Sequence, residues 1–150
     1  MNQTEGKRMI AEIIRELSRE GRIRKSRSFT QHGNTSVYEH SVRVAYYSLK
    51  AAEFLHLNGH RKELVRGALL HDYFLYDWHE KDRSHSLHGF RHPFTALRNA
   101  SADYRLTRRE QNIILRHMFP LVPIPPACPE GWIVCMVDKG CSLYETVRRR

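Results

Sequence analysis

Six histidine and aspartate residues recur along this chain, and apart from one adjacent pair each falls in a helical segment of its own. They are the doublet His71-Asp72, together with His40, His92, His117 and Asp138. Imidazole nitrogens and carboxylate oxygens are the side-chain donors that bind divalent transition metals in water. Six such groups can supply two metal ions, so the sequence predicts a metal-centred chemistry that the surrounding elements must position.

The first of these residues is predicted to lie on the inner face of a helix that begins at Ser36. Ser36 and Glu39 match a capping box, in which the serine accepts a backbone N–H and the glutamate reaches back. His40 shares a helix face with Val44, so we expect its imidazole to point toward the core. Asn58-Gly59 is typical of a helix end and predicts the stop.

The doublet is predicted to lie at the inner C-terminal end of the next helix, over residues 60–72. Residues 73–90 are rich in aromatic residues and histidines without a clear period, which indicates a loop or a broken helix beside the site. A short helix is expected to begin near Pro93, because proline suits the first turn.

Two later helices are predicted to supply the remaining ligands. Thr107 and Glu110 match a second capping box, and the helix that they open carries His117 on its inner side. Five prolines over residues 120–129 predict a rigid loop before a last helix, which carries Asp138 on an apolar face. Buried carboxylates are costly unless paired or metal-bound, so a metal with histidines is the expected partner.

We expect one all-α domain over residues 1–150, built as a bundle of about six helices. An N-terminal helix occupies residues 1–21, with an apolar stripe and a glycine stop, and a polar basic connection covers residues 22–35. The metal-binding helical core occupies residues 36–147. Strand signals are scarce, and no internal repeat is present.

The amino-acid composition indicates which cellular location and which partners to expect. The chain has 41% hydrophobic residues, and no stretch approaches the ~20 apolar residues that a membrane span needs. The charged N-terminus has no signal-peptide core, and three cysteines without a CxxC pair are typical of reduced thiols, so we expect a cytoplasmic protein with no membrane partner. The net charge of +9 favours anionic partners, but it is spread out, so nucleic acid is not the favoured partner. Nothing in the sequence indicates an oligomeric state.

The order of these six residues resembles the HD-domain superfamily of metal-dependent phosphohydrolases, and the placement of His92 and His117 resembles its dinuclear branch. The similarity covers about residues 30–145, and the run Gln31–Ser36 resembles a subset of small bacterial HD proteins. It implies two divalent transition metal ions, with Fe or Mn favoured and Zn, Co and Ni left open. The implied ligands of the first ion are His40, His71, Asp72 and Asp138. The implied ligands of the second are Asp72, His92 and His117, with Asp72 bridging.

The resemblance also implies hydrolysis of a small phosphate ester, with a nucleotide as the favoured substrate class. His71 and Asp72 are then the catalytic centre, where the ions activate a water molecule. The candidate substrate-binding residues are His32, His88, Arg91 and Lys139, each of which has an equally simple role as a solvated residue. Met118 stands where the cyclic-dinucleotide hydrolase branch has a second histidine, so the resemblance assigns no particular substrate.

Two other classes of function stay open at this point. Some HD-fold proteins hold two irons with a similar ligand set and activate dioxygen. A non-catalytic module that binds a ligand or nucleic acid is the third reading, and it predicts salt-dependent binding that survives loss of Asp72. The aromatic residues Tyr73, Phe74, Tyr76 and Trp78 can form a stacking wall for a base, although ordinary core packing is the simpler expectation.

Overall fold

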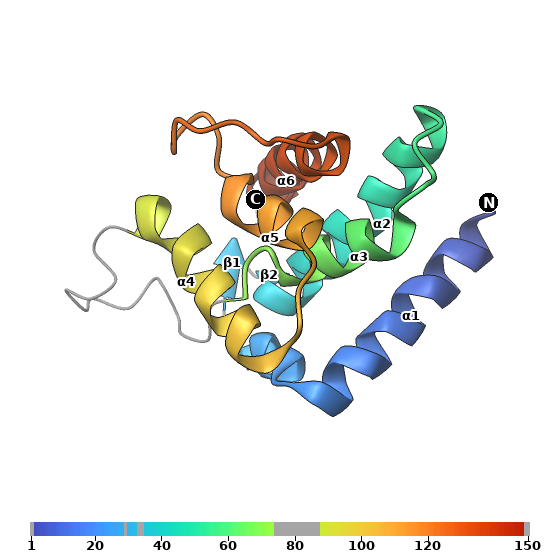
Figure 1. The fold of residues 1–150 in the computed structure, drawn as a ribbon, viewed down its shortest axis with the longest axis horizontal. Coiled ribbons are helices and arrows are strands. Elements are labelled where there is room, and N and C mark those ends of the chain that lie inside the picture. The colour runs from blue at the N-terminus through green and yellow to red at the C-terminus, as the bar shows by residue number, and fades with distance from the viewer. Residues whose placement is uncertain (1, 29, 33–34, 74–87, 149–150) are drawn as a thin grey trace.

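A computed structural model describes residues 2–28, 30–32, 35–73 and 88–148 of the chain. In order, its elements are α1 (Gln3–Glu20), the 3-10 helix η1 (Ile23–Ser28), β1 (Thr30–His32), β2 (Thr35–Ser36), α2 (Val37–Phe54), α3 (Arg61–Leu70), α4 (His88–Asp103), α5 (Arg108–Arg116) and α6 (Pro129–Arg148). The expectation of an all-α fold is confirmed (Figure 1). Within the expected polar connection, the structure adds the 3-10 helix η1 and a short antiparallel hairpin of β1 and β2.

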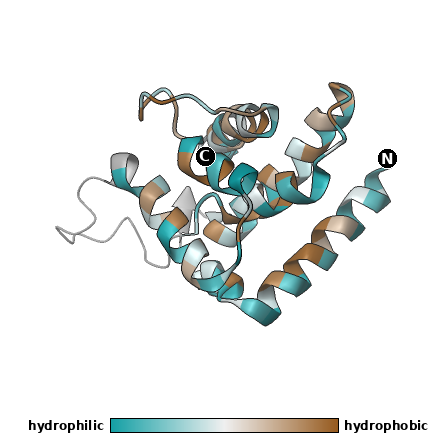
Figure 2. Cartoon of the chain, viewed as in Figure 1, coloured by the Kyte–Doolittle hydropathy of each residue, from teal (hydrophilic) through white to brown (hydrophobic). Residues whose placement is uncertain are grey.

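Four helices close around the middle of the molecule. α2 packs on α3 and on α6, α3 packs on α5, and α5 packs on α6. α4 lies against α5, and α1 covers one side of α2 and α3 (Figure 1). The apolar stripe of α1 faces this centre, where Ile10, Ile13 and Leu17 are buried (Figure 2). This closed arrangement brings residues from five helical segments to one interior point.

Gly67 sets the close approach of α3 to α5. A Cβ atom at Gly67 would lie 2.6 Å from Cδ1 of Ile113 and 2.9 Å from its Cβ, distances that real Cβ atoms do not show. The missing side chain therefore allows two helices to touch. Their C-terminal ends carry His71 and His117, so this contact sets the separation of two candidate ligands.

Two predicted helix boundaries were wrong. α2 ends at Phe54 instead of Asn58-Gly59, because His56 adopts a left-handed conformation with φ 57° and closes the helix early. The amide of His56 donates to Glu53 O and that of Leu57 to Ala52 O, which is the bonding of a Schellman motif.

The second wrong boundary is the start of α4, which begins at His88 and carries Pro93 within the helix. The nitrogen of Pro93 has no hydrogen to give to the carbonyl of Gly89, one turn earlier, so the helix forgoes one backbone bond. This arrangement places His92 in the second turn of α4 instead of just before a helix.

Both predicted N-caps are present. At Thr107 the full capping box is formed, with both reciprocal bonds to Glu110. At Ser36 the side chain accepts a hydrogen bond from the amide of Glu39 at 3.1 Å, as predicted, and α2 begins directly after it.

No helix in the described part of the chain is long and apolar enough to cross a membrane.

Candidate metal centre

All six predicted ligand residues meet in the interior. His40 comes from α2, His71 and Asp72 from the C-terminal end of α3, His92 from α4, His117 from the end of α5 and Asp138 from α6. Their exposed fractions are 0% for His40, His71 and His117, 1% for Asp72, 5% for His92 and 7% for Asp138. Polar groups buried this deeply among apolar neighbours need strong partners, and here the partners are one another.

One group of four side chains converges on a single point. His40 Nε2 lies 2.9 Å from Asp138 Oδ1 and 3.4 Å from Asp72 Oδ2. His71 Nε2 lies 3.3 Å from Asp138 Oδ1 and 3.2 Å from Asp72 Oδ2. Two imidazole nitrogens and two carboxylate oxygens therefore alternate around a small space. Their ligand atoms all lie within 4.8 Å of one another, which is compatible with one shared cation.

A second group shares Asp72 with the first. His92 Nε2 lies 3.1 Å and His117 Nε2 lies 3.3 Å from Oδ1 of Asp72. The two imidazole nitrogens are themselves 2.7 Å apart. Asp72 thus turns Oδ2 toward His40 and His71 and Oδ1 toward His92 and His117. A carboxylate between two histidine pairs is the arrangement expected of a ligand that bridges two ions.

Three of the histidines are held with a nitrogen lone pair facing the carboxylates. Nδ1 of His71 lies 2.5 Å from the carbonyl oxygen of Ala68, and Nδ1 of His117 lies 2.7 Å from that of Ile114. Nδ1 of His40 lies 2.8 Å from Oε1 of Glu145. Each of these oxygens accepts a hydrogen bond from Nδ1, so Nε2 is the nitrogen turned toward the carboxylates and the one that would bind a metal ion.

The centre requires positive charge. Bare imidazole nitrogens and carboxylate oxygens repel each other at about 3 Å unless a proton or a metal ion lies between them. Burial opposes the charged form of His40, but its hydrogen bonds to Asp138 and Glu145 outweigh that effect and raise its pKa to about 9. Burial likewise disfavours ionised Asp72 and Asp138, yet the neighbouring histidines hold both pKa values well below the ordinary range. Without metal, protons must fill this role, and divalent ions fit it better.

Glu145 and Arg43 extend the centre toward the surface, and sequence reasoning missed both. Glu145 is 1% exposed, accepts Nδ1–H of His40 on one oxygen and pairs with Arg43 through the other. The available signal was spacing, because Glu145 lies two helical turns after Asp138 and Arg43 one turn after His40. A carboxylate behind a ligating histidine fixes its ring and raises its basicity.

The structure describes the side chains of two of the four predicted substrate-binding residues, Arg91 and Lys139. Arg91 is exposed on α4. The ammonium of Lys139 donates to the carbonyl oxygens of His117 and Cys135, at 3.2 and 3.4 Å. The side chains of His32 and His88 lie outside the described part of the structure. A substrate role for these four residues stays a prediction.

The aromatic segment after the doublet is described only at its first residue. Tyr73 is 1% exposed, and its hydroxyl donates to Asp103 Oδ2 at 2.5 Å while accepting the amide of Arg22 at 2.7 Å. Tyr73 is therefore a core residue, which supports the simpler of its two expected roles. Phe74, Tyr76 and Trp78 lie outside the described residues.

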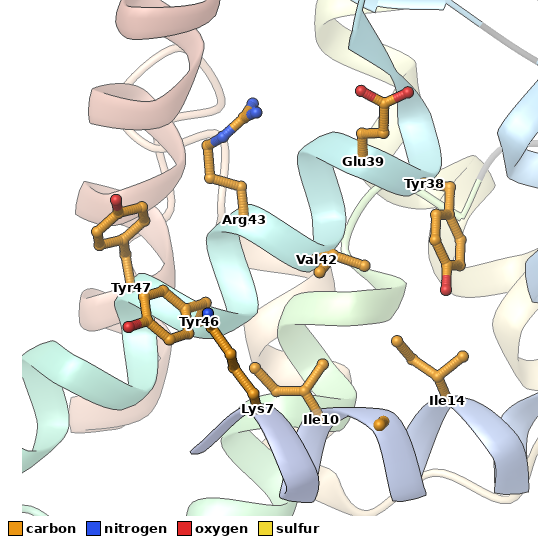
Figure 3. A pocket seen from close by; sticks show the side chains of 10 residues that line it. Lys7, Ile10, Ile14, Tyr38, Glu39, Val42, Arg43, Tyr46 and Tyr47 are labelled. Atoms are coloured by element: carbon orange, nitrogen blue, oxygen red, sulfur yellow. The ribbon is translucent and has the colours of Figure 1, made fainter. Parts of the chain in front are cut away.

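A groove of about 560 Å³ lies between α1 and α2 (Figure 3). Ile10 and Ile14 of α1 point into it, and Arg43 stands at its edge and turns away from α1. None of the six ligand residues lines this groove. Among the residues that line it, Arg43 connects the groove to the centre through its ion pair with Glu145.

The comparison with protein families bears directly on this geometry. A family model of the HD domain matches residues 37–140, a span that contains all six buried histidine and aspartate residues. The chain belongs to the HD domain family. HD domains bind divalent metals, and most members of the family are metal-dependent hydrolases. Searches of curated proteins and of solved structures found no match.

Proposed function

We propose that this HD domain is a phosphohydrolase that uses two divalent metal ions to cleave a small phosphate ester. The observation that carries the proposal is the division of Asp72 between two histidine pairs, at 3.2 and 3.4 Å on one oxygen and 3.1 and 3.3 Å on the other. Both groups contain only nitrogen and oxygen donors, which suits Fe, Mn, Co, Ni or Zn.

The residues present fit two ions. His40, His71, Asp72 and Asp138 would hold the first, and Asp72, His92 and His117 the second. Bound there, a pair of divalent ions supplies Lewis acidity toward phosphoryl oxygens and lowers the pKa of a water molecule. A nucleotide is the substrate class that we favour, because the chain carries a net charge of +9 and attracts anions.

The protein's own contribution is to hold the nitrogen and oxygen donors in fixed positions. His71 and His117 each donate Nδ1–H to a backbone carbonyl in their own helix, so their Nε2 lone pairs keep one direction. His40 is fixed in the same sense by Glu145. A centre organised this way before metal binds loses little free energy to rearrangement when the ions arrive.

The test is a panel of phosphate monoesters, diesters and nucleotides, assayed with added Mn, Co, Ni or Mg in air and under anaerobic conditions. The proposal expects phosphate release that needs metal, proceeds equally without dioxygen, and is lost in Asp138→Asn. The exposed His60→Gln is the matched control and should retain activity. Turnover that requires dioxygen, with a mixed-valent di-iron signal, would contradict hydrolysis and favour an oxygenase.

A further inference from the structure

The face of α6 turned away from the metal centre is apolar along its length. Trp132, Met136, Leu143 and Val147 follow one another at intervals of four, seven and four residues, so they form a single stripe on the helix. Tyr144 stands beside them. Their exposed fractions run from 42% for Trp132 to 67% for Leu143. Asp138 and Glu145 occupy the opposite face of α6, which is buried. The helix is therefore buried on one side, and its other side is apolar and exposed to solvent.

Charge is nearly absent from this outer face. The structure describes the whole of α6, and Lys139 is its one exposed charged residue between Trp132 and Val147. The ammonium of Lys139 donates to His117 O and Cys135 O, so it is engaged within the chain. In a protein with 27% charged residues, an apolar face of about four turns is typical of an interaction surface.

Gly140 lies midway along the stripe, and no contact among the described residues requires a glycine there. A Cβ atom at Gly140 would meet no atom within 4 Å, whereas glycine inside a helix costs about 1 kcal/mol relative to alanine. A glycine in such a place suits the close approach of a second backbone. A groove of about 460 Å³ runs beside it, between α2 and α6, lined by Tyr47, Val137 and Tyr144 among others.

We propose that the outer face of α6 binds a second copy of this chain, with the two α6 helices antiparallel and crossing at Gly140. The exposed stripe of α6 is complementary to itself about a two-fold axis beside Lys139 and Gly140. That axis sets Met136 opposite Leu143 and Trp132 opposite Val147 of the other protomer. Both pairs are apolar and exposed in the single chain, and antiparallel helix dipoles attract.

The available surface matches what a dimer needs. Six large side chains are each 42–67% exposed on this side of the molecule: Tyr47, Trp132, Met136, Leu143, Tyr144 and Val147. Together they offer several hundred Å², the same order as the roughly 800 Å² that each partner buries in a standard interface. The inference does not depend on the proposed function, because the metal centre lies on the opposite side of α6. It does imply that Asp138 and Glu145 sit on the helix that dimerisation would hold in place.

Sedimentation equilibrium of the full chain tests the proposal, with Leu143→Lys and Gly140→Leu as variants. We expect a wild-type dimer, and a dissociation constant raised about tenfold or more in Leu143→Lys by an unpaired buried charge. Gly140→Leu adds apolar surface and fits the isolated chain, yet it should also weaken the dimer because its side chain holds the helices apart. Circular dichroism should show both variants folded.

Phe54→Lys is the matched control, because Phe54 is 83% exposed on α2 but lies outside the stripe. Its dimerisation should equal that of the wild type. A wild-type chain that is monomeric at every concentration tested overturns the proposal. If that monomer binds phosphatidylglycerol vesicles, the apolar face is a membrane-binding surface instead, and the proposal is overturned as well. Equal dimerisation in Leu143→Lys, or tighter dimerisation in Gly140→Leu, overturns it as well.

Discussion

Asp72 and the four histidines around it illustrate how single atoms define the centre. Each oxygen of Asp72 faces two imidazole nitrogens, and three of the rings have their outward nitrogen tied to an acceptor. The inward nitrogens are therefore fixed before any ion binds. At this scale the least expected residue is Glu145, which holds His40 from behind and is itself held by Arg43.

Glu145→Gln should weaken metal binding without removing a ligand. The amide keeps the shape of the carboxylate but loses its charge, so His40 becomes less basic and Arg43 loses its ion pair. We expect the affinity for Mn, measured by isothermal titration calorimetry, to fall about tenfold to a hundredfold. The exposed Glu12→Gln should bind Mn as the wild type does. Unchanged affinity in Glu145→Gln would show that Glu145 has no positioning role.

At the scale of elements, two helix ends decide where the ligands lie. α3 and α5 end at His71 and His117, and they approach closely because Gly67 has no side chain to keep Ile113 away. α2 ends in a Schellman motif that uses His56 where glycine is common. The contact at Gly67 positions the site, whereas the Schellman motif at His56 only reverses the direction of the chain.

Gly67→Ala should destabilise the fold by about 1–3 kcal/mol, because its methyl group would overlap Ile113 and force α3 and α5 apart. Chemical denaturation would measure the loss, and metal content should fall with it because His71 and His117 separate. Gly59→Ala provides the comparison, since a Cβ there meets nothing within 4 Å. Equal stability of the two variants would mean that the contact between α3 and α5 can accommodate a methyl group at position 67.

His56→Gly should stabilise the protein by about 0.5 kcal/mol. Glycine adopts the left-handed conformation without the steric cost that histidine bears at φ 57°, although it gives up some of that gain as unfolded-state entropy. Thermal and urea unfolding would measure the change. His56→Ala is the sharper comparison, because alanine keeps a Cβ and should bring no such gain.

At the scale of the whole molecule, a polar cluster joins the N-terminal segment to α4. Arg22 pairs with Asp103 through Nε and Nη2, at 2.8 and 3.0 Å, and Tyr73 donates to the same carboxylate. Burial disfavours ionised Asp103, but these hydrogen bonds outweigh it and lower its pKa. The stabilisation is therefore present above the ordinary pKa of about 4 and is lost as the pH falls through the lowered value.

The free energy of unfolding of the wild type should accordingly exceed that of Asp103→Asn at pH 7, by a margin that shrinks as the pH falls below about 4. Comparing the two proteins by denaturant unfolding at each pH cancels the titration of other carboxylates. A margin that stays constant down to pH 2 would show that Asp103 does not gain its partners on folding.

The parts of this fold that the sequence predicts are those with a short-range physical cause. The caps at Ser36 and Thr107 and the inward direction of His40 follow from residue type and helical period. The end of α2 does not, because glycine at position 59 is the better left-handed residue and yet His56 takes that conformation. The role of Glu145 was not predicted, because a buried glutamate in a helix has the same local sequence pattern as an exposed one. Its burial depends on Arg43 and His40, which are 102 and 105 residues away along the chain.

The central claim is that Asp72 joins two metal sites, and counting the metal ions per chain tests it most directly. Elemental analysis of protein purified without chelator and saturated with Mn should give two ions for the wild type and one for His117→Gln. Asp138→Asn should also retain one, and Asp72→Ala should retain neither. One ion in the wild type, or a count for Asp72→Ala no lower than for the other variants, would contradict a shared carboxylate at the centre of this HD domain.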